Sequence, residues 1–561
     1  MGRWAGMAVL LGWLGTSSTA LAAGTGTAAT SGASPLAGRL AASEHGWPLL
    51  ACLLVMFLLP GLALYYGGLV RRKNILATMM QVMICLALVS VYWVAFGYNF
   101  AFGKSLVGLI GWSSELVFLQ GIQPGDRLPG TNIPVYLHVF YHGLLAALAP
   151  AILAGALAER VRFGPFCCFV LLWVTFVYCP LVHAVWAKNW FGAMAGGRPG
   201  ELFVGWLGYW GLRDFAGGIV VQMAAGVGGL AAALVVRRRQ GFPETVMPPN
   251  SMVRTLFGTG LLWFGWFGLT SGFACGDMGR LIPALLATHL AASAAALTWL
   301  AVEWWHHGKP TAIGFASGAI AGLVAASVAA GWTPAWGALL TGASAGLVCY
   351  LAVHLKPRLK YDDALDAFGV HGVGGLWGAV LSGFFLSPVL GAAGEASGTV
   401  ANQIALSLLA AILCFAVTWL LTLLVELLGR LTVDRVAEND GLDRSEHGGI
   451  GFDLGHEMSL KPGVARAEPR AASEPPDGIL RYSMIVDGID TDELTRVWST
   501  LCQVSTQQPS PEFRRVYACV TTMNGTRFRF RGGEPQSLRE DLERLLRDRL
   551  RSASVRVRLE T

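Results

Sequence analysis

The chain has 561 residues, of which 54% are hydrophobic and only 14% carry a charged side chain. Soluble domains contain about 25% charged residues, so this composition indicates a membrane protein and argues against a soluble enzyme. Charged residues are concentrated after residue 430, so the formal net charge of +6 reflects membrane topology and a basic tail and predicts no nucleic-acid partner.

Residues 1–23 read MGRWAGMAVLLGWLGTSSTALAA, with one early arginine, an apolar core and a small-residue motif before a stretch rich in Gly, Thr and Ser. This pattern is typical of a cleavable secretory signal peptide, and a short additional transmembrane helix is the alternative. Removal of the signal peptide would leave the mature N-terminus outside the cell.

Eleven apolar segments of membrane-spanning length follow, since about 20 apolar residues cross a bilayer. They lie near 47–70, 75–102, 134–158, 164–187, 214–236, 252–275, 278–305, 311–330, 333–355, 366–387 and 401–429. With the N-terminus outside, the internal loops contain 12 Lys and Arg residues and the external loops contain 6. This bias supports the orientation and predicts an all-α polytopic domain over 47–430 with a cytoplasmic C-terminus. Within it, GFASGAIAGL spaces glycines four apart, which favours close helix packing.

Residues 431–478 are predicted to form a cytoplasmic tail and linker, which ends in the polar stretch KPGVARAEPRAASEPPD. In 479–561, strand-like runs RYSMIVDGI, EFRRVYACVTTM, TRFRFRGG and SVRVRLE alternate with helical patterns TDELTRVWSTLCQV and SLREDLERLLRDRL. Asn524-Gly525 between the second and third runs is a strong hairpin signal. The order βαββαβ predicts a small α+β domain of the ferredoxin-like type.

The ten cysteines match neither a disulfide framework nor a metal-binding motif. Several lie singly in apolar runs, as small buried hydrophobic side chains do. The sequence therefore predicts no metal site, no cofactor and no catalytic residue.

One histidine stands out in the predicted spans, in DALDAFGVHGVGGLWGAV at 363–380, where His371 is flanked by glycines. An ionisable side chain inside a span indicates function by default, and a histidine that only ties two helices together is the alternative. Asp366 near the start of the same helix is expected to have a structural role, because a carboxylate is favourable at a helix N-terminus.

A second polar cluster lies in DFAGGIVVQMAAGVGG at 214–229. Gln222 lies about two helical turns after Asp214 and must face a partner or a lumen, because an unpaired amide is costly in lipid. Two interpretations of Asp214 remain open, namely a helix cap and a direct electrostatic role.

Several motifs together resemble the Amt/Mep/Rh ammonium transporter family over residues 47 to 456. They are FLLPGLALYYGGLVRRKN, GALAERVRF, DFAGG, GWFG, GKPTAIGFASGAIAGLVA, DAFGVHGVGG and NDGLDRSEHG, in family order. The resemblance implies an eleven-helix protomer with two inverted five-helix halves, an external N-terminus and a homotrimer with one pore per subunit. It also implies ammonium or ammonia as the substrate.

The resemblance assigns pore roles to two residues and reveals a departure at one of them. His371 matches the second histidine of the family's pore pair, whereas Gln222 occupies the position of the first. Glutamine donates and accepts hydrogen bonds but does not titrate, so the proton relay implied by the family would be incomplete here. Trp266 matches the family's pore-lining tryptophan.

The outer mouth departs from the family as well. Leu145 and Leu269 occupy the positions of the two gate phenylalanines, and Phe273 that of a serine in the external cation site. Trp186 matches the tryptophan of that site, and a cation over an aromatic face gains about 0.5–2 kcal/mol. The resemblance therefore implies ammonium recruitment at Trp186. Asp214, which matches a family aspartate, and Tyr141, a polar neighbour of the gate with His142, are expected to assist.

We expect ammonium transport in a bacterial inner (plasma) membrane, with lipid, further copies of the chain and a cytoplasmic regulatory protein of the PII type as candidate partners. The alternative is an ammonium sensor that transports poorly and signals through the C-terminal domain. A passage for another small neutral molecule, such as carbon dioxide, is the third interpretation.

Overall fold

The computed structural model describes residues 35–129, 131–188, 190, 204–274, 277–385, 400–451, 481–504, 511–524, 526–550 and 555–560. The predicted signal peptide at 1–23 and the linker from 452 to 478 lie outside the described residues. The chain divides into two compact units between Pro462 and Gly463, and each is described by itself.

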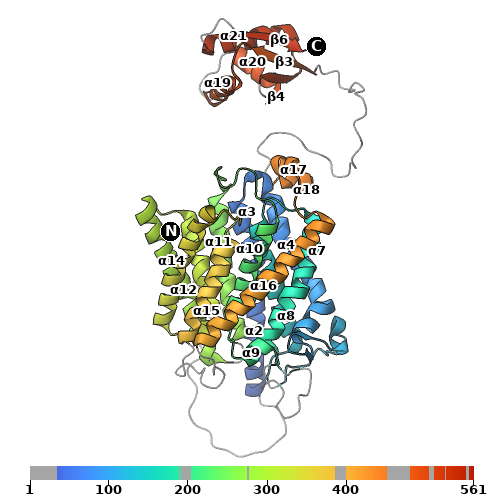
Figure 1. Ribbon diagram of the computed structural model, residues 1–561, viewed down its shortest axis with the longest axis vertical. Helices are drawn as coiled ribbons and strands as arrows, with labels where there is room; N and C mark the ends of the chain where they lie inside the picture. The colour runs from blue at the N-terminus through green and yellow to red at the C-terminus, as the bar shows by residue number, and fades with distance from the viewer. Residues whose placement is uncertain are drawn as a thin grey trace, which may run out of the picture. The chain divides into compact units, whose positions relative to one another are not determined.

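The first unit is a bundle of long helices that stand roughly side by side (Figure 1). Among the described residues, nine helical runs are long and apolar enough to cross a membrane: Gly46–Leu69, Arg72–Phe102, Val135–Leu157, Phe163–Trp186, Gly218–Val235, Gly279–His307, Ala335–Leu359, Phe368–Phe385 and Val400–Gly429. The unit is thus a mostly helical membrane domain, as predicted. The other two predicted spans are also helical, but α13 has only 16 residues and α11 is not among the nine.

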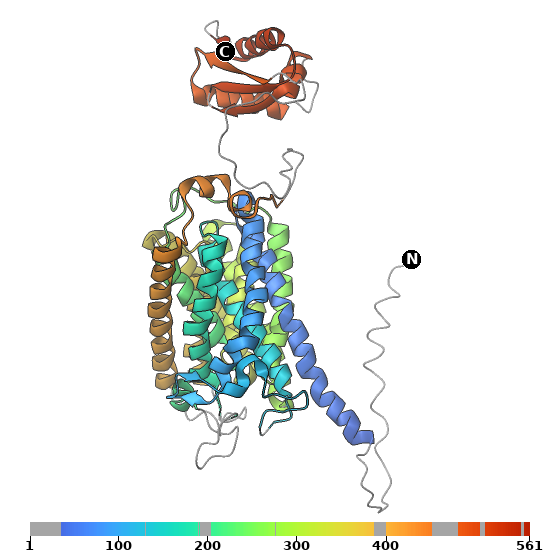
Figure 2. The ribbon, with the colours of Figure 1, turned by 90° about the vertical axis from the view of Figure 1, so that its right-hand side faces the viewer.

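The runs consist of individual elements joined at short breaks. They are α2 (Pro35–Met56), α3 (Leu58–Leu69), η1 (Arg72–Asn74), α4 (Ile75–Tyr92), η2 (Trp93–Gly97), α5 (Tyr98–Phe102), α6 (Val135–Leu157), α7 (Phe163–Trp173), η4 (Val174–Tyr178), α8 (Cys179–Trp186), η5 (Gly218–Met223), α10 (Ala224–Val235), α11 (Met252–Phe273), α12 (Met278–His307), α13 (Ala312–Ser327), η6 (Ala330–Trp332), α14 (Ala335–Leu359), η7 (Phe368–Gly372), α15 (Val373–Phe385) and α16 (Val400–Gly429). Short pieces β1 (Ser105–Leu106), β2 (Ile110–Gly111), η3 (Ser114–Leu119) and α9 (Trp206–Tyr209) lie between them. Figure 2 shows α2 reaching beyond the bundle, and α16 runs obliquely across α10, α15 and α7.

Closely packed glycines set the spacing of the central helices. A Cβ on Gly318 would lie 2.9 Å from the carbonyl oxygen of Ala295, and one on Gly322 would lie 2.3 Å from that of Ala291. These backbones of α13 and α12 meet as the glycine spacing predicted.

The segment that follows α16 packs against residues at one end of the bundle. Its helices are α17 (Arg435–Asp440) and α18 (Leu442–His447). Asp443 accepts a hydrogen bond from the backbone N–H of Ala77 at 2.8 Å, and Glu438 accepts one from that of Gln240 at 2.6 Å. The start of the predicted tail therefore belongs to the first unit.

Beneath this segment lies a buried network of ion pairs between loops. Asp362 pairs with Arg160 at 2.7 Å and with Arg239 at 2.7 Å, and Glu159 pairs with Arg239 at 3.2 Å and Arg71 at 2.9 Å. Burial alone would raise the pKa of Asp362, but Arg160 and Arg239 outweigh it and hold that pKa below its ordinary value. The carboxylate of Asp362 therefore stays charged, and together with Glu159 it joins four loops.

The second unit is a four-stranded sheet with helices against one face. Its elements are β3 (Arg481–Asp487), α19 (Thr491–Val504), α20 (Pro511–Cys519), β4 (Val520–Asn524), β5 (Arg527–Arg531), α21 (Pro535–Leu550) and β6 (Arg556–Glu560). The strand order is β4-β5-β3-β6, and all neighbours are antiparallel. Phe528 and Phe530 of β5 point into the core, while its three arginines are exposed.

The second strand of this unit begins later in the sequence than predicted. Residues 511–519 form α20, and only 520–524 form a strand. Phe513 and Val516 are buried three residues apart, which is a helical and not a strand spacing. The β4–β5 pairing places the predicted hairpin between Asn524 and Arg527, although Gly525 itself lies outside the described residues.

Gly226→Ala is expected to destabilise the first unit, because the added Cβ would lie 2.1 Å from the backbone nitrogen of Gly372. Overpacking of this kind costs about 1–3 kcal/mol, so the thermal unfolding midpoint of the purified protein should fall. Gly260→Ala on α11 is the matched control, since nothing lies within 4 Å of its Cβ. That variant should keep or raise the midpoint, and an equal fall in both would contradict the packing argument.

Asp362→Asn is expected to lower the free energy of unfolding by about 3–5 kcal/mol, because it leaves Arg160 and Arg239 buried with one partner fewer. Asp277→Asn, which breaks an exposed pair with Arg280, is the control and should cost less than about 1 kcal/mol. The folded-state pKa of Asp362 is depressed, so its contribution is complete above about pH 4 and is lost as the pH falls further. The thermal unfolding midpoints of the wild type and both variants are measured against pH. If the midpoint of Asp362→Asn falls below about pH 4 as steeply as that of the wild type, the argument is refuted.

Candidate pore site

Gln222 and His371 meet inside the bundle. They lie in two π-helical turns, η5 and η7, which are wider than α-helical turns and often occur at functional sites. The Oε1 atom of Gln222 is 2.8 Å from Nδ1 of His371, and the two residues are 0% and 4% exposed. An amide oxygen only accepts hydrogen bonds, so the imidazole proton is on Nδ1 and the lone pair on Nε2. The Nε2 group of Gln222 is buried and finds no hydrogen-bond partner among the described residues.

Glycines explain how the two turns come so close. Gly226 lies against the backbone of Gly372, and a Cβ on Gly375 would lie 2.5 Å from the carbonyl oxygen of Gly218. The glycines around His371 are therefore needed for backbone contact between η5–α10 and η7–α15.

Two carboxylates hold the N-terminal ends of these helical runs. Asp214 accepts hydrogen bonds from the backbone N–H groups of Gly217, Ile219 and Val220 at 3.0, 2.9 and 2.7 Å. The fifth predicted span accordingly begins at Gly218 and not at 214. This geometry is that of a cap, which satisfies N–H groups that have no partner within the helix.

The prediction that Asp366 caps the second run is wrong. Asp363 does so, accepting from the N–H groups of Ala367 and Phe368 at 3.1 and 2.7 Å. Asp366 has a left-handed backbone with φ of 59° and pairs with Lys356 at 2.5 Å. The carboxylate of Asp363, four residues before Ala367, reaches the first N–H groups of the helix. The carboxylate of Asp366 points to Lys356 instead.

Aromatic side chains from α6, α8 and α11 form a second cluster, which we call the vestibule cluster. It contains Trp186, Phe273, His142 and Tyr141. The ring centroids of Trp186 and Phe273 are 4.7 Å apart, and His142 lies 5.5 Å from each. The indole N–H of Trp186 donates to the backbone carbonyl of Asp214 at 2.9 Å, which fixes the ring. The structure thus brings the predicted recruitment residues together.

A second histidine beside this cluster was missed by sequence reasoning. The rings of His138 and His142 are 4.3 Å apart, and Phe102 lies against both at 4.7 and 4.8 Å. The hydroxyl of Tyr98 is 3.1 Å from Nδ1 of His138. Nδ1 of His142 is buried and has no partner among the described residues. The signal was present in YLHVFYH, since residues four apart share one face of a helix.

Leucines lie one turn from the vestibule cluster on two helices. Leu145 follows His142 on α6 and Leu269 precedes Phe273 on α11, and both are fully buried. The hydroxyl of Tyr141 donates to the carbonyl of Leu269 at 2.5 Å and so links the helices. Trp266 donates its indole N–H to Ser327 at 2.8 Å.

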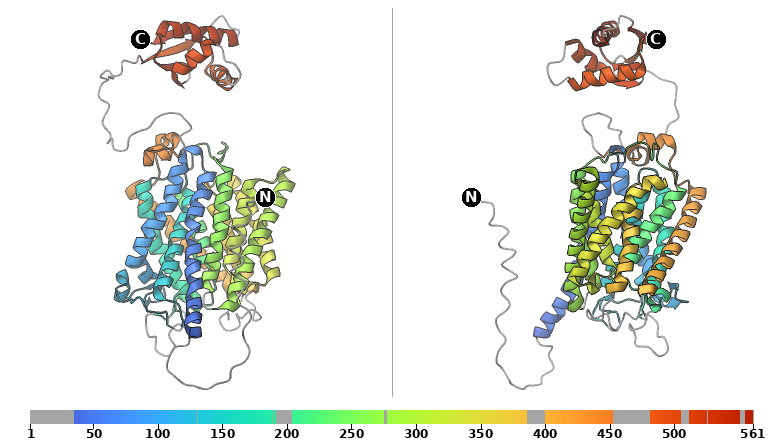
Figure 3. Two further views of the ribbon diagram at one scale, coloured as in Figure 1. Left: turned by 180° about the vertical axis from the view of Figure 1, so that it is seen from behind. Right: turned by 60° about the vertical axis from the view of Figure 1, so that its left-hand side comes forward.

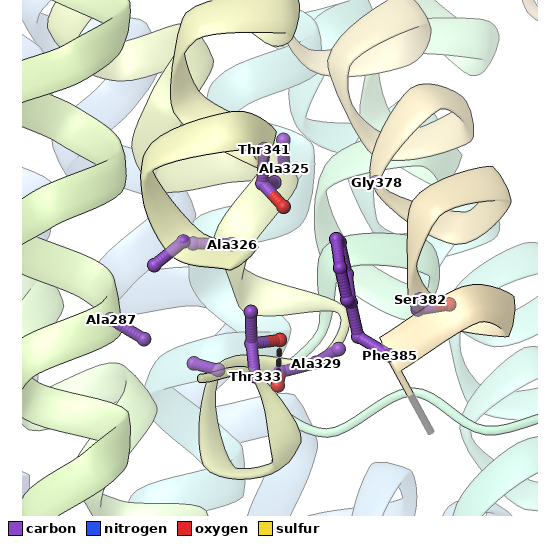
Figure 4. A pocket seen from close by; sticks show the side chains of 11 residues that line it. Ala287, Ala325, Ala326, Ala329, Thr333, Thr341, Gly378, Ser382 and Phe385 are labelled. Atoms are coloured by element: carbon purple, nitrogen blue, oxygen red, sulfur yellow. Dashed lines mark hydrogen bonds between the residues drawn. The ribbon is translucent and has the colours of Figure 1, made fainter. Parts of the chain in front are cut away.

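A small cavity near α13, α14 and α15 contains none of the predicted site residues. It is lined mainly by alanines, with Thr333, Thr341, Ser382 and Phe385 (Figure 4). The hydroxyl of Thr333 is already used, because it donates to the carbonyl of Ala329 at 2.8 Å. We assign no function to this cavity.

Comparison with known proteins decides the family. Residues 46–452 match the model of the Ammonium Transporter Family. The chain belongs to the Ammonium Transporter Family. The Amt/Mep/Rh resemblance is therefore confirmed, and the chain is a member of a transport family and not of an enzyme family.

Relatives of this transporter family member include bacterial and archaeal proteins. An ammonium transporter of Bacillus subtilis is 39% identical over 71% of this chain and 95% of its own length. Ammonium transporter Amt1 of Archaeoglobus fulgidus is 37% identical over 72% of this chain and 98% of its own.

Solved structures support the same fold. Mep2 of Saccharomyces cerevisiae has a TM-score of 0.63 and 32% identity over 70% of this chain and 88% of its own. A sensor Amt protein has a TM-score of 0.66 and 26% identity over 73% of this chain and 99% of its own. The roles of individual pore residues stay predictions.

Proposed function

We propose that the chain conducts ammonium as ammonia through one pore in each protomer of a homotrimer. The proposal includes eleven spans with two inverted five-helix halves, in a bacterial inner membrane, with the N-terminus outside and the C-terminus cytoplasmic. The observation that carries it is the buried pair of Gln222 and His371, which offers hydrogen bonds in an apolar bundle. The ammonium transporters among the relatives support the substrate.

Recruitment of the cation is assigned to the vestibule cluster. The faces of Trp186 and Phe273 attract a cation. Nδ1 of His142, which has no partner among the described residues, supplies an acceptor where the family's serine is absent. Tyr141 holds α6 to α11, and Asp214 holds the indole of Trp186 through its carbonyl. The imidazole of His142 therefore takes the place of the serine hydroxyl in the family's external cation site.

Passage beyond the cluster favours the neutral molecule. A bare ammonium ion is costly in a low-dielectric lumen, so its proton leaves before Leu145 and Leu269, which act as an apolar gate, and crosses separately by way of water and His371. Ammonia then meets the amide N–H groups of Gln222, for which the described part of the chain offers no acceptor, and the Nε2 lone pair of His371, with Trp266 as part of the wall. Because Gln222 does not titrate, conduction should be slower than through an imidazole pair.

The alternative function is ammonium sensing, and the likeness to a sensor Amt protein favours it specifically. In this case ammonium binds the vestibule cluster, little flux follows, and the second unit carries the output. Its strand order fits a ferredoxin-like domain with one added helix. A cytoplasmic partner of the PII type is a further candidate for reading the state of the pore.

Ammonium-evoked current in proteoliposomes is the experiment that tests transport. We expect a saturable wild-type current and an increase of about tenfold or more in Gln222→His, because a second imidazole completes the proton relay. Gln120→His, at an exposed position, controls for the added histidine and should match the wild type.

Each other outcome has a defined meaning. A silent wild type with current in Gln222→His would replace the transport proposal with the sensor alternative. Silence in both, with ammonium binding retained, would place the block at Leu145, Leu269 and Phe273 or in a pore held closed by the tail.

His142→Leu is expected to weaken ammonium binding about tenfold or more, because a hydrogen bond to a charged ligand is worth about 1.5–3 kcal/mol. The ammonium-dependent rise in thermal unfolding midpoint measures this binding whether or not the pore conducts. His142→Gln keeps an acceptor and should recover part of the affinity. His289→Leu, at an exposed position on α12, is the control, and equal affinity in all four proteins would remove His142 from the recruitment site.

A further inference from the structure

Three histidines lie together at one end of α12 and α14, apart from the residues assigned to transport. His306 and His307 occupy the last turn of α12, and His354 lies on α14. One ligand nitrogen from each lies within 4.8 Å of the other two, and all three residues are exposed. Figure 3, with Figure 1, shows α12 and α14 side by side at an edge of the bundle. The sequence predicted no metal site, because no motif links histidines so far apart.

The spacing of two of these nitrogens fits a shared metal ion. Nε2 of His307 and Nε2 of His354 are 3.4 Å apart. A Zn–N bond of about 2.0–2.1 Å and tetrahedral angles place two ligand nitrogens about 3.3–3.4 Å apart. The separation of the two nitrogens is therefore the one expected between two ligands of a tetrahedral metal site.

Tyr350 orients two of the three imidazoles through hydrogen bonds. Its backbone carbonyl accepts from Nδ1 of His354 at 2.8 Å, so the proton of this ring is on Nδ1 and the lone pair is on Nε2. Its hydroxyl is 2.8 Å from Nδ1 of His306, which again leaves Nε2 for a metal. Metal-binding histidines are typically held in this way through their other nitrogen. The side chain of Tyr350 is buried, so the orientation is part of the fold.

We propose that His306, His307 and His354 bind one divalent transition-metal ion, with Zn²⁺ as the representative ion. Imidazole nitrogens suit Zn²⁺, Cu²⁺ and Ni²⁺, and three of them leave a fourth position for water. The exposed rings permit entry from solvent. A bound ion joins the ends of α12 and α14 directly and stabilises their packing.

The test uses the full-length protein in detergent without an affinity tag. Zn²⁺ affinity is measured by competition with a chromophoric chelator, and geometry by the visible absorption of Co²⁺, which is intense in tetrahedral sites. We expect one ion per chain, a loss of affinity of about tenfold or more in each of His306→Gln, His307→Gln and His354→Gln, and a smaller loss in Tyr350→Phe. His289→Gln, an exposed histidine earlier on α12, is the control and should bind as the wild type does.

A second readout separates the site from a folding defect. Zn²⁺ should raise the thermal unfolding midpoint of the wild type and His289→Gln but not of the three ligand variants, while all five share one midpoint without metal. A variant that carries all three His→Gln changes is tested as well. Undiminished Zn²⁺ affinity in that variant, or an equal loss of Zn²⁺ affinity in His289→Gln, would overturn the proposal. So would Co²⁺ spectra without the tetrahedral band, which would indicate adventitious binding only.

Discussion

The buried carboxylate of Asp362 determines how the ends of several helices meet. Arg160 and Arg239 reach it from the loops after α6 and α10, and Arg239 also pairs with Glu159, which binds Arg71 after α3. Burying a charge is costly unless its partners are in place, so these loops fold as one unit or not at all. Because each loop ends a helix of the bundle, the network fixes the relative heights of those helices.

The same network is connected along the chain to the helical turn that contains His371. Asp363 follows Asp362 directly and caps the N–H groups of Ala367 and Phe368, so the start of η7 is set by the loop that the ion pairs hold. His371 lies in that π-helical turn. The segment after α16 contacts the network as well, since the backbone N–H of Val433 donates to the carbonyl of Arg160 at 3.0 Å. A partner that moved this segment would therefore act on the loop of Arg160, which is ion-paired to Asp362 in the loop before His371.

The membrane helices were predictable because runs of apolar residues near 20 in length have few other solutions. The π-helical turns at Gln222 and His371 were not, since one extra residue in a turn leaves no trace in composition. Asp363 and Asp366 both precede the same helix, and only the backbone geometry of Asp366 decides which of them caps it. In the second unit, the apolar residues of 511–519 are compatible with a strand or with a helix. The structure decides for a helix, because Phe513 and Val516 are both buried.

The hydrogen bond between Gln222 and His371 limits what the His371 imidazole can do with a proton. In a pair of imidazoles, either ring can hold the shared proton, and a proton that arrives on one side can leave on the other. Here the amide oxygen only accepts, which holds the proton of His371 on Nδ1. A proton that reached Nε2 would create an imidazolium whose neighbour cannot take up the proton released from Nδ1. The pair can therefore exchange hydrogen bonds with a neutral molecule, whereas a proton that crosses at this point would need water in place of the second imidazole.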